Sequence, residues 1–319
     1  MRRNVALLVA SVFISLTIAE LVLHAFHPAW VVPYPPVCYW PQLYERWDPH
    51  GYRLHPARRL EEYYPPARPR RIAIHANAEG FRSARDFGGG DARSHVVVLG
   101  DSMVFGSGVE EGERFTERLE AMEPGWRVDN MGMVAYGTDL MLRALETVPV
   151  TPPPDVVVFA IFSHDVYRVM PEATGVGFPL PRYVLRDGQL VTVPYAARPA
   201  WSRLRLVEGL RYVRWRYGAP SYALNAAILD RFRAIAEERR FVPAIVFLPA
   251  KRERWDDRVR RRWLAAEAAR RAVAYLDVSD AVHAAGGEAL YIPDDAHWNE
   301  RGHAVVAEAL HPFLAHLLH

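Results

Sequence analysis

The sequence predicts an α/β protein: a parallel β-sheet of about five strands covered by helices on both faces, preceded by a transmembrane helix. From Val96 to the C-terminus, segments typical of strands alternate with segments typical of helices. The strand segments are continuous apolar runs, such as "DVVVFAIF" at 155–162, and such runs are typical of strands buried on both faces. Near the N-terminus, a longer apolar run has the length needed to cross a bilayer.

Residues 1–27 form the predicted membrane anchor. Arg2 and Arg3 precede an apolar run from Val5 to Phe26, which two polar residues interrupt near its end. About 20 apolar residues suffice to cross a bilayer as a helix, and positively charged flanks stay on the cytoplasmic side. The sequence therefore predicts a single anchor with the rest of the chain outside the cytoplasm, in a periplasm or at a cell surface. A cleaved signal peptide is the alternative.

Residues 28–94 form a second region, rich in proline and aromatic residues. Prolines exclude a regular helix, and the aromatic rings argue against a free linker. We expect an extension packed on the surface of the domain that follows. The only cysteine of the chain, Cys38, lies here, so no intramolecular disulfide can support the fold.

Residues 95–319 carry the predicted catalytic domain. A parallel sheet binds its ligands outside the carboxyl ends of its strands, so residues that follow a strand are candidates for a site. The five predicted strands are 96–100, 127–132, 155–162, 243–249 and 274–279, and the predicted helices are 113–122, 138–146, 221–239, 256–272 and 301–318.

Residues 168–220 interrupt this alternation as an insertion. "PRYVLRDGQLVTVP" predicts a β-hairpin with Asp187 and Gly188 in the turn, and the basic, aromatic segment 200–218 predicts a helix. Because the insertion follows a strand end, it could cover the site as a lid. We favour a helix whose apolar face packs on the domain; a helix lying on a membrane surface is the alternative.

A serine and a histidine far apart in the chain follow predicted strand ends. Ser102 comes after Gly100, where the first strand turns, and His297 lies in "DDAHWN" before the last helix. A serine hydroxyl is a weak nucleophile that needs a base within hydrogen-bond reach. Histidine can accept that proton and return it to a leaving group, and a carboxylate fixes the imidazole tautomer.

In this order, Gly100-Asp101-Ser102, the glycine of "NMG" and the Asp-x-x-His of "DDAH" resemble the motif blocks of the SGNH (GDSL-type) hydrolase superfamily. The anchor and the upstream "NAEGFR" resemble a bacterial membrane-anchored subgroup. The resemblance implies a flavodoxin-like sheet and an acyl-enzyme mechanism. It makes Ser102 the nucleophile, His297 the general base and Asp294 the acid of a catalytic triad. Asp295 is the alternative acid. The N–H groups of Ser102 and Gly132 would stabilise the oxyanion.

The third oxyanion donor departs from the family pattern. Where the family carries asparagine in a Gly-x-Asn-Asp block, this chain has His164 before Asp165. A neutral imidazole has one N–H to donate, so His164 is the candidate donor, with Asp165 or another neighbour setting its tautomer. Donation by Ser163, or by no third group, is the alternative.

Other classes of site receive little support. Lys251 follows a strand and is either a substrate contact or a solvated loop residue. The histidines lack metal-ligand spacing, so we expect no metal and no cofactor. The formal net charge is only +2, with scattered arginines, so no nucleic-acid partner is expected. The sequence does not say whether the chain has a protein partner.

The sequence thus predicts a membrane-anchored, extracytoplasmic serine esterase or deacylase. Its location favours an acylated envelope glycan, a lipid-linked substrate or a small ester. A polysaccharide O-acyltransferase using the same triad is one alternative, to which the "HWN" segment is also similar. The other is a catalytically degenerate glycan-binding or assembly protein.

Overall fold

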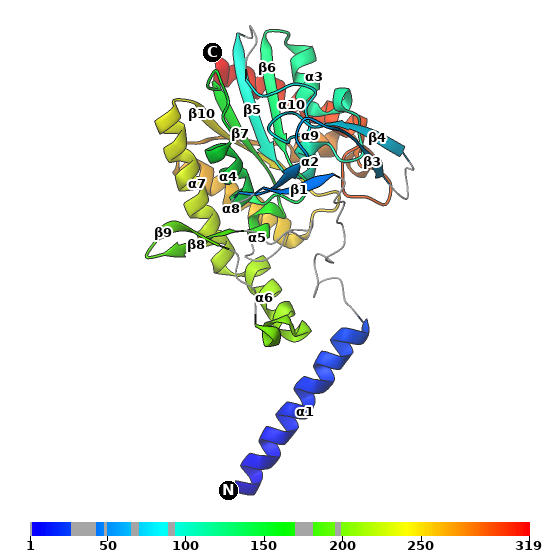
Figure 1. Ribbon diagram of the computed structural model, residues 1–319, viewed down its shortest axis with the longest axis vertical. Helices are drawn as coiled ribbons and strands as arrows, with labels where there is room; N and C mark the ends of the chain where they lie inside the picture. Colours follow the sequence, from blue (N-terminus) through cyan, green and yellow to red (C-terminus); the bar gives the residue numbers. More distant parts are fainter. Residues whose placement is uncertain are drawn as a thin grey trace.

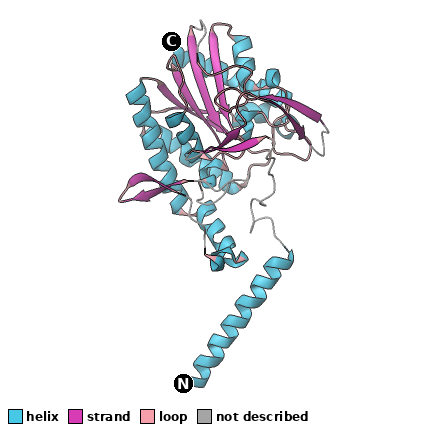
Figure 2. Ribbon diagram, in the orientation of Figure 1, coloured by secondary structure: helices cyan, strands magenta, loops and turns pink. Residues whose placement is uncertain are grey.

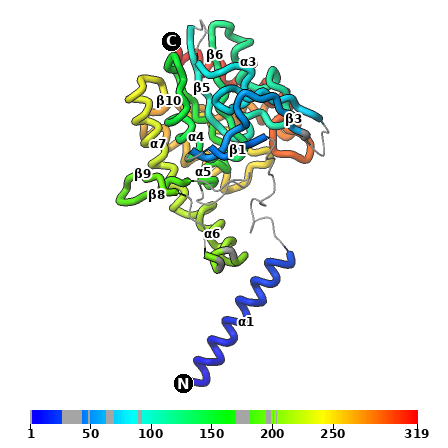
Figure 3. Tube along the Cα trace, viewed as in Figure 1, coloured from blue at the N-terminus to red at the C-terminus, as the bar shows by residue number. Residues whose placement is uncertain are grey.

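The computed structural model describes residues 2–26, 43–47, 50–64, 70–88, 93–169, 181–194 and 199–319 (Figure 1). The only cysteine, Cys38, lies outside these residues. Helix α1 (Arg2–Phe26) extends away from the rest of the molecule, with the N-terminus at its far end (Figure 3). It is long and apolar enough to cross a membrane, and none of its residues is buried.

The central sheet has five parallel strands in the order β11-β10-β7-β5-β6, which is the flavodoxin-like order. The predicted fold class is therefore confirmed. In the register, Gly100 lies opposite Gly132, and Phe162 lies opposite Leu248, so the carboxyl ends are nearly level. The strands are β5 (Ser94–Gly100), β6 (Trp126–Gly132), β7 (Val156–Phe162), β10 (Val242–Leu248) and β11 (Ala274–Asp277).

Both faces of the sheet are buried, as the continuous apolar strands predict. Alternate residues of β5 enter two different cores: Val97 and Leu99 on one face, Val96 and Val98 on the other. Helices cover both faces (Figure 2). The first core includes residues of α4 (Thr138–Thr147), α7 (Ala219–Arg239) and α8 (Trp255–Arg270), and the second includes residues of α3 (Phe115–Met122), α9 (Ser279–Ala284) and α10 (Glu300–Leu318).

The extension contributes to the core more than a surface spacer would. It forms two antiparallel strand pairs, β1 (Tyr44–Trp47) with β2 (Gly51–Leu54) and β3 (Arg59–Tyr64) with β4 (Arg70–His75). These strands are a finding beyond the sequence prediction. The residues of the extension that are fully buried include Tyr52, Leu54, Ile72, Ile74, Phe81 and Arg82.

The insertion contains the predicted hairpin, β8 (Arg182–Arg186) with β9 (Gln189–Val193). The two turn residues have left-handed φ values of 51° and 76°, as Asp-Gly turns favour. Helix α6 (Arg205–Tyr217) follows. It turns Gly209, Tyr212 and Arg216 toward the domain but leaves other apolar side chains exposed.

Candidate active site

Ser102 lies just after the carboxyl end of β5, the strand between β7 and β6. It is the first residue of α2 (Ser102–Phe105), whose N-cap is Asp101: the Asp101 Oδ1 accepts the N–H of Met103 at 2.9 Å. A Cβ on Gly100 would lie 2.1 Å from the side chain of Val104, so only glycine lets the helix begin this close to the strand. The serine is therefore presented at the edge of the sheet by a tight turn.

Buried side chains hold carbonyls in α2 and in the turn that follows it; the helix is too short to be stable alone. Asn130 of β6 donates from Nδ2 to the carbonyl of Val104 at 2.7 Å. Arg82, fully buried, donates to the carbonyls of Gly106 and Val109, each at 2.8 Å. Neither role was predicted; the only sequence signal was that Arg82 ends the "NAEGFR" segment. These contacts fix the position of the nucleophilic helix.

His297 lies beside Ser102, as the sequence predicts for residues at one sheet edge. Its Nε2 is 2.8 Å from the Ser102 Oγ, and its Nδ1 is 2.6 Å from the Asp295 Oδ1. The same Asp295 oxygen accepts the His297 backbone N–H at 2.7 Å. The carboxylate thus fixes the ring with Nε2 directed at the serine.

The acid beside His297 is therefore Asp295, the alternative, and not Asp294. Asp294 adopts a left-handed φ of 55°, and its side chain is exposed at the turn. That turn directs the side chain of the next residue back along the loop toward the imidazole. The carboxylate that bonds the ring is thus two residues before the histidine, whereas the Asp-x-x-His pattern points to Asp294, three before it.

Lys251 holds the loop that carries Asp295. Its Nζ donates to the carbonyls of Ile292 and Asp295, at 2.9 and 3.0 Å. The side chain is half-buried, so Lys251 is not the solvated loop residue that the sequence offered as one alternative. Lys251 lies at the predicted edge of the sheet, but it contacts the loop backbone.

Of the expected oxyanion donors, Gly132 has its N–H engaged elsewhere. This group donates to the Asn130 Oδ1 at 2.9 Å. A Cβ on Gly132 would lie 2.3 Å from the backbone nitrogen of Phe105, so the glycine is required for the close approach of α2. The N–H of Ser102, in contrast, has no acceptor among the described residues.

His164 lies at the end of β7, immediately before α5 (Asp165–Arg168). Its ring packs against those of Phe162 and Tyr167, and its Nε2 is 3.9 Å from the Asp257 Oδ1. Burial and the neighbouring arginines hold the pKa of His164 well below its ordinary value, so the ring is neutral. Within the described part of the chain, its contacts do not include the serine–histidine pair. Ser163, the other candidate, is fully buried and donates to Asp257.

Asp165 takes part in a buried charge cluster and does not orient the histidine before it. One nitrogen of Arg168 lies 2.6 Å from both the Asp101 Oδ2 and the Asp165 Oδ1. The second Asp165 oxygen accepts the N–H of Phe162 at 2.8 Å. Burial and the nearby Asp101 raise the pKa of Asp165 well above its ordinary value. The cluster joins the turn after β5 to the turn after β7.

The extension places a buried carboxyl group near the triad. Glu62 of β3 is only 2% exposed, and its Oε2 has no hydrogen-bond partner among the residues that the structure describes. Burial raises the pKa of Glu62; the charges of Arg82 and His297 lower it, and that of Asp295 raises it. This group was missed because a glutamate in "RLEEYY" looks like an ordinary surface residue.

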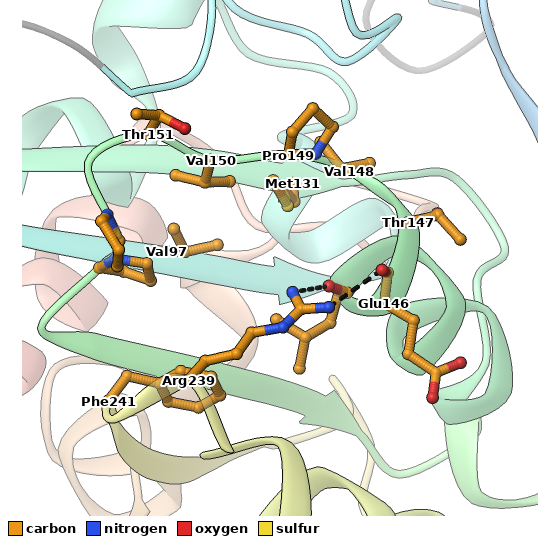
Figure 4. A pocket seen from close by; sticks show the side chains of 13 residues that line it. Val97, Met131, Glu146, Thr147, Val148, Pro149, Val150, Thr151, Arg239 and Phe241 are labelled. Atoms are coloured by element: carbon orange, nitrogen blue, oxygen red, sulfur yellow. Dashed lines mark hydrogen bonds between the residues drawn. The ribbon is translucent and has the colours of Figure 1, made fainter. Parts of the chain in front are cut away.

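One cavity lies away from the catalytic contacts, and another lies beside them. An apolar cavity of about 470 Å³ is lined by Val97, Met131 and Phe241, and Arg239 crosses it to the carbonyls of Leu145 and Glu146 (Figure 4). None of the candidate site residues lines it. An open depression of about 920 Å³ lies over the loop of Asp294 and Asp295. In the described ranges, no group of three His, Cys, Asp or Glu side chains could hold a metal ion.

Comparison with known proteins assigns the domain. A model of the GDSL-like Lipase/Acylhydrolase family matches residues 98–305, more than half of the chain. No curated protein matches.

Similar solved structures include a lipolytic G-D-S-L family protein from Veillonella parvula DSM 2008 (14% identity, TM-score 0.44, covering 70% of this chain and 98% of that one). They also include LAE5, an α/β hydrolase enzyme from the metagenome of Lake Arreo, Spain (17% identity, TM-score 0.47, covering 72% of this chain and 96% of that one). A third is the psychrotrophic esterase EstA from Pseudoalteromonas sp. (12% identity, TM-score 0.44, covering 70% of this chain and 98% of that one). With its five-stranded parallel sheet and its family match, the chain belongs to the GDSL-like lipase/acylhydrolase family, a family of ester hydrolases within the SGNH/GDSL superfamily.

Proposed function

We propose that the chain is a membrane-anchored serine esterase or deacylase that acts through an acyl-enzyme at Ser102. The observation that carries the proposal is the hydrogen-bonded series from the Ser102 Oγ through His297 to Asp295, at 2.8 and 2.6 Å. A nucleophile, a base in contact with it and a carboxylate that orients the base are the parts that acyl transfer requires.

In the proposed mechanism, the Ser102 Oγ attacks the ester carbonyl while its proton passes to the Nε2 of His297. Asp295 stabilises the imidazolium that forms. The imidazolium then protonates the leaving alcohol, and the acyl group remains on Ser102. Water attacks this acyl-enzyme in the second half and gives a proton to His297. When the bond from the acyl carbon to the Ser102 Oγ breaks, His297 returns that proton to Ser102 and the carboxylic acid is released. The N–H of Ser102 is the oxyanion donor best supported by the contacts; loss of one such donor costs on the order of a hundredfold in rate.

We further propose that α1 anchors the chain and that the catalytic domain lies outside the cytoplasm. Arg2 and Arg3 at the start of α1 favour a cytoplasmic N-terminus. This location favours an acylated envelope glycan or a lipid-linked ester as the substrate.

A serine-directed fluorophosphonate probe tests the proposal. We expect the full chain in detergent to be labelled, and the Ser102→Ala variant not to be. The same pair, tested on acetyl and longer acyl esters, gives the acyl preference. Product analysis with an added sugar acceptor separates hydrolysis from acyl transfer. A folded wild-type chain that neither reacts with the probe nor turns over any ester would refute the proposed activity.

A further inference from the structure

A row of exposed apolar side chains runs along α6 and onto the start of α8. Leu210, Val213 and Tyr217 of α6 share one helix face, being three or four residues apart, and are 64%, 45% and 38% exposed. Tyr217 stacks on Trp255 of α8 with ring centroids 5.4 Å apart, so the row continues across both helices. We define the docking face as Trp201, Leu204, Leu210, Val213, Tyr217, Trp255 and Val259, all exposed.

Such a face is unusual for a domain surrounded by water, because soluble proteins rarely expose contiguous large apolar side chains. The same two helices also carry exposed arginines, among them Arg214, Arg258 and Arg262. Tryptophan and leucine beside arginine are typical of helices that lie in the headgroup region of a bilayer. The chemistry therefore fits an anionic lipid surface.

A contact between α1 and α6 places this face near the membrane. The two carboxylate oxygens of Glu20 in α1 accept the backbone N–H groups of Arg205 and Leu206, at 2.7 and 2.9 Å. Glu20 thus satisfies free N–H groups in the first turn of α6. The apolar part of α1 before Glu20 begins at Val5 and has a length of about 22 Å. It therefore crosses most of the roughly 30 Å hydrocarbon thickness of a bilayer and places Glu20 toward the outer boundary. In Figure 1, α6 lies at the end of the domain nearest α1.

The docking face is also tied to the catalytic edge of the sheet. Arg216 of α6, buried between the docking face and the domain, donates to Asp256 of α8 at 2.8 Å. Arg260 of α8 lies 3.0 Å from Asp257 and donates to the Oγ of Ser163, which follows β7, at 2.9 Å. These charged groups are buried, so the contact is stiffer than a surface ion pair. The position of α6 therefore sets the position of the carboxyl end of β7.

We propose that the docking face lies in the headgroup region of the bilayer that α1 crosses, and that it holds the catalytic edge of the sheet at a set height above the lipid. The inference rests on the proposed anchor. Through α6, the insertion would then make a second contact between the protein and the membrane. The sequence analysis instead favoured a helix whose apolar face packs on the domain.

The test uses the full chain with Cys38→Ser and one new cysteine, labelled with the environment-sensitive fluorophore NBD. The chain is placed in nanodiscs of phosphatidylcholine and phosphatidylglycerol, one copy per disc. Leu210→Cys and Val213→Cys report on the docking face. Ile14→Cys reports on α1, and Met122→Cys, 43% exposed on α3, is the matched control. Nitroxide-bearing lipids quench a label that lies in the bilayer.

We expect labels at 14, 210 and 213 to be quenched several-fold more strongly than the label at 122. If 14 is quenched while 210 and 213 match 122, docking is wrong and the anchor stands. If 14 is not quenched, the anchor and the docking both fail. Labels at 210 and 213 that are shielded from aqueous iodide but not quenched by lipid would indicate a protein partner and would also overturn the inference. Turnover of a soluble ester by the same variants is measured separately. A failure of the esterase proposal can therefore be told apart from a failure of membrane docking.

Discussion

Replacing Asp295 by asparagine removes the charge beside His297 while keeping the shape of the side chain. The Asp295 Oδ1 accepts two His297 donors, the ring Nδ1–H at 2.6 Å and the backbone N–H at 2.7 Å. An amide oxygen can still accept the backbone N–H, but it leaves the developing imidazolium without a counter-charge. Changes of this kind cost about 10²- to 10⁴-fold in kcat, roughly 3–5 kcal/mol of transition-state stabilisation.

Asp294→Asn is the matched control, because it makes the same chemical change one residue earlier. Asparagine tolerates the left-handed φ of 55° at that position, and the side chain is exposed, so we expect kcat within about twofold of wild type. The assay is hydrolysis of p-nitrophenyl acetate, with thermal unfolding of both variants as the check on folding. A large loss in Asp294→Asn together with near-normal Asp295→Asn would refute the assignment of the acid.

Three further outcomes are expected. Arg82→Lys keeps one charge but loses several hydrogen bonds to carbonyls around α2, so stability should fall by about 2–4 kcal/mol in urea unfolding and kcat should fall more than KM rises. Lys251→Met should lower kcat about tenfold with little change in KM or melting temperature, because the loop of Asp295 loses two hydrogen bonds; unchanged kcat would exclude a positioning role. Burial lowers the pKa of His303 from an ordinary 6.5 to about 3. Between pH 3 and pH 6.5, the unfolded state therefore binds a proton at this histidine that the folded state does not bind. As the pH is lowered below about 6.5, the free energy of unfolding should therefore decrease, by up to about 1.4 kcal/mol per pH unit from this group. Urea unfolding across pH 4–7 should show a shallower decrease for His303→Asn than for wild type. Equal slopes for the two proteins would contradict this.

The sheet could be predicted because its signal is local. Each central strand is an apolar run with a polar or glycine stop, and parallel strands end at one edge, so a serine after β5 and a histidine before the last helix could be expected to meet. The choice between Asp294 and Asp295 is different. It depends on the backbone of one turn, and Lys251 holds that turn from the loop after β10.

The roles of buried polar residues could not be predicted for a related reason. An arginine or glutamate in a polar stretch is ordinarily exposed, and only the tertiary fold shows that Arg82 and Glu62 are buried. The strands of the extension were hidden in the same way, because prolines and tyrosines obscure an alternating pattern and packing against the domain supplies the stability.

These contacts bear on where the catalytic unit begins. The family match begins at residue 98, and the sequence suggests a domain boundary at 94. Yet the nucleophilic helix is a single turn, and a single turn gains stability only from what surrounds it. Two of its carbonyls accept side-chain hydrogen bonds: that of Val104 from Asn130, inside the match, and that of Phe105 from Arg82, outside it. Because buried carbonyls without donors cost about 1–3 kcal/mol each, a chain beginning at residue 95 would lose both stability and the geometry at Ser102. The extension is, on this reasoning, a structural part of the active site.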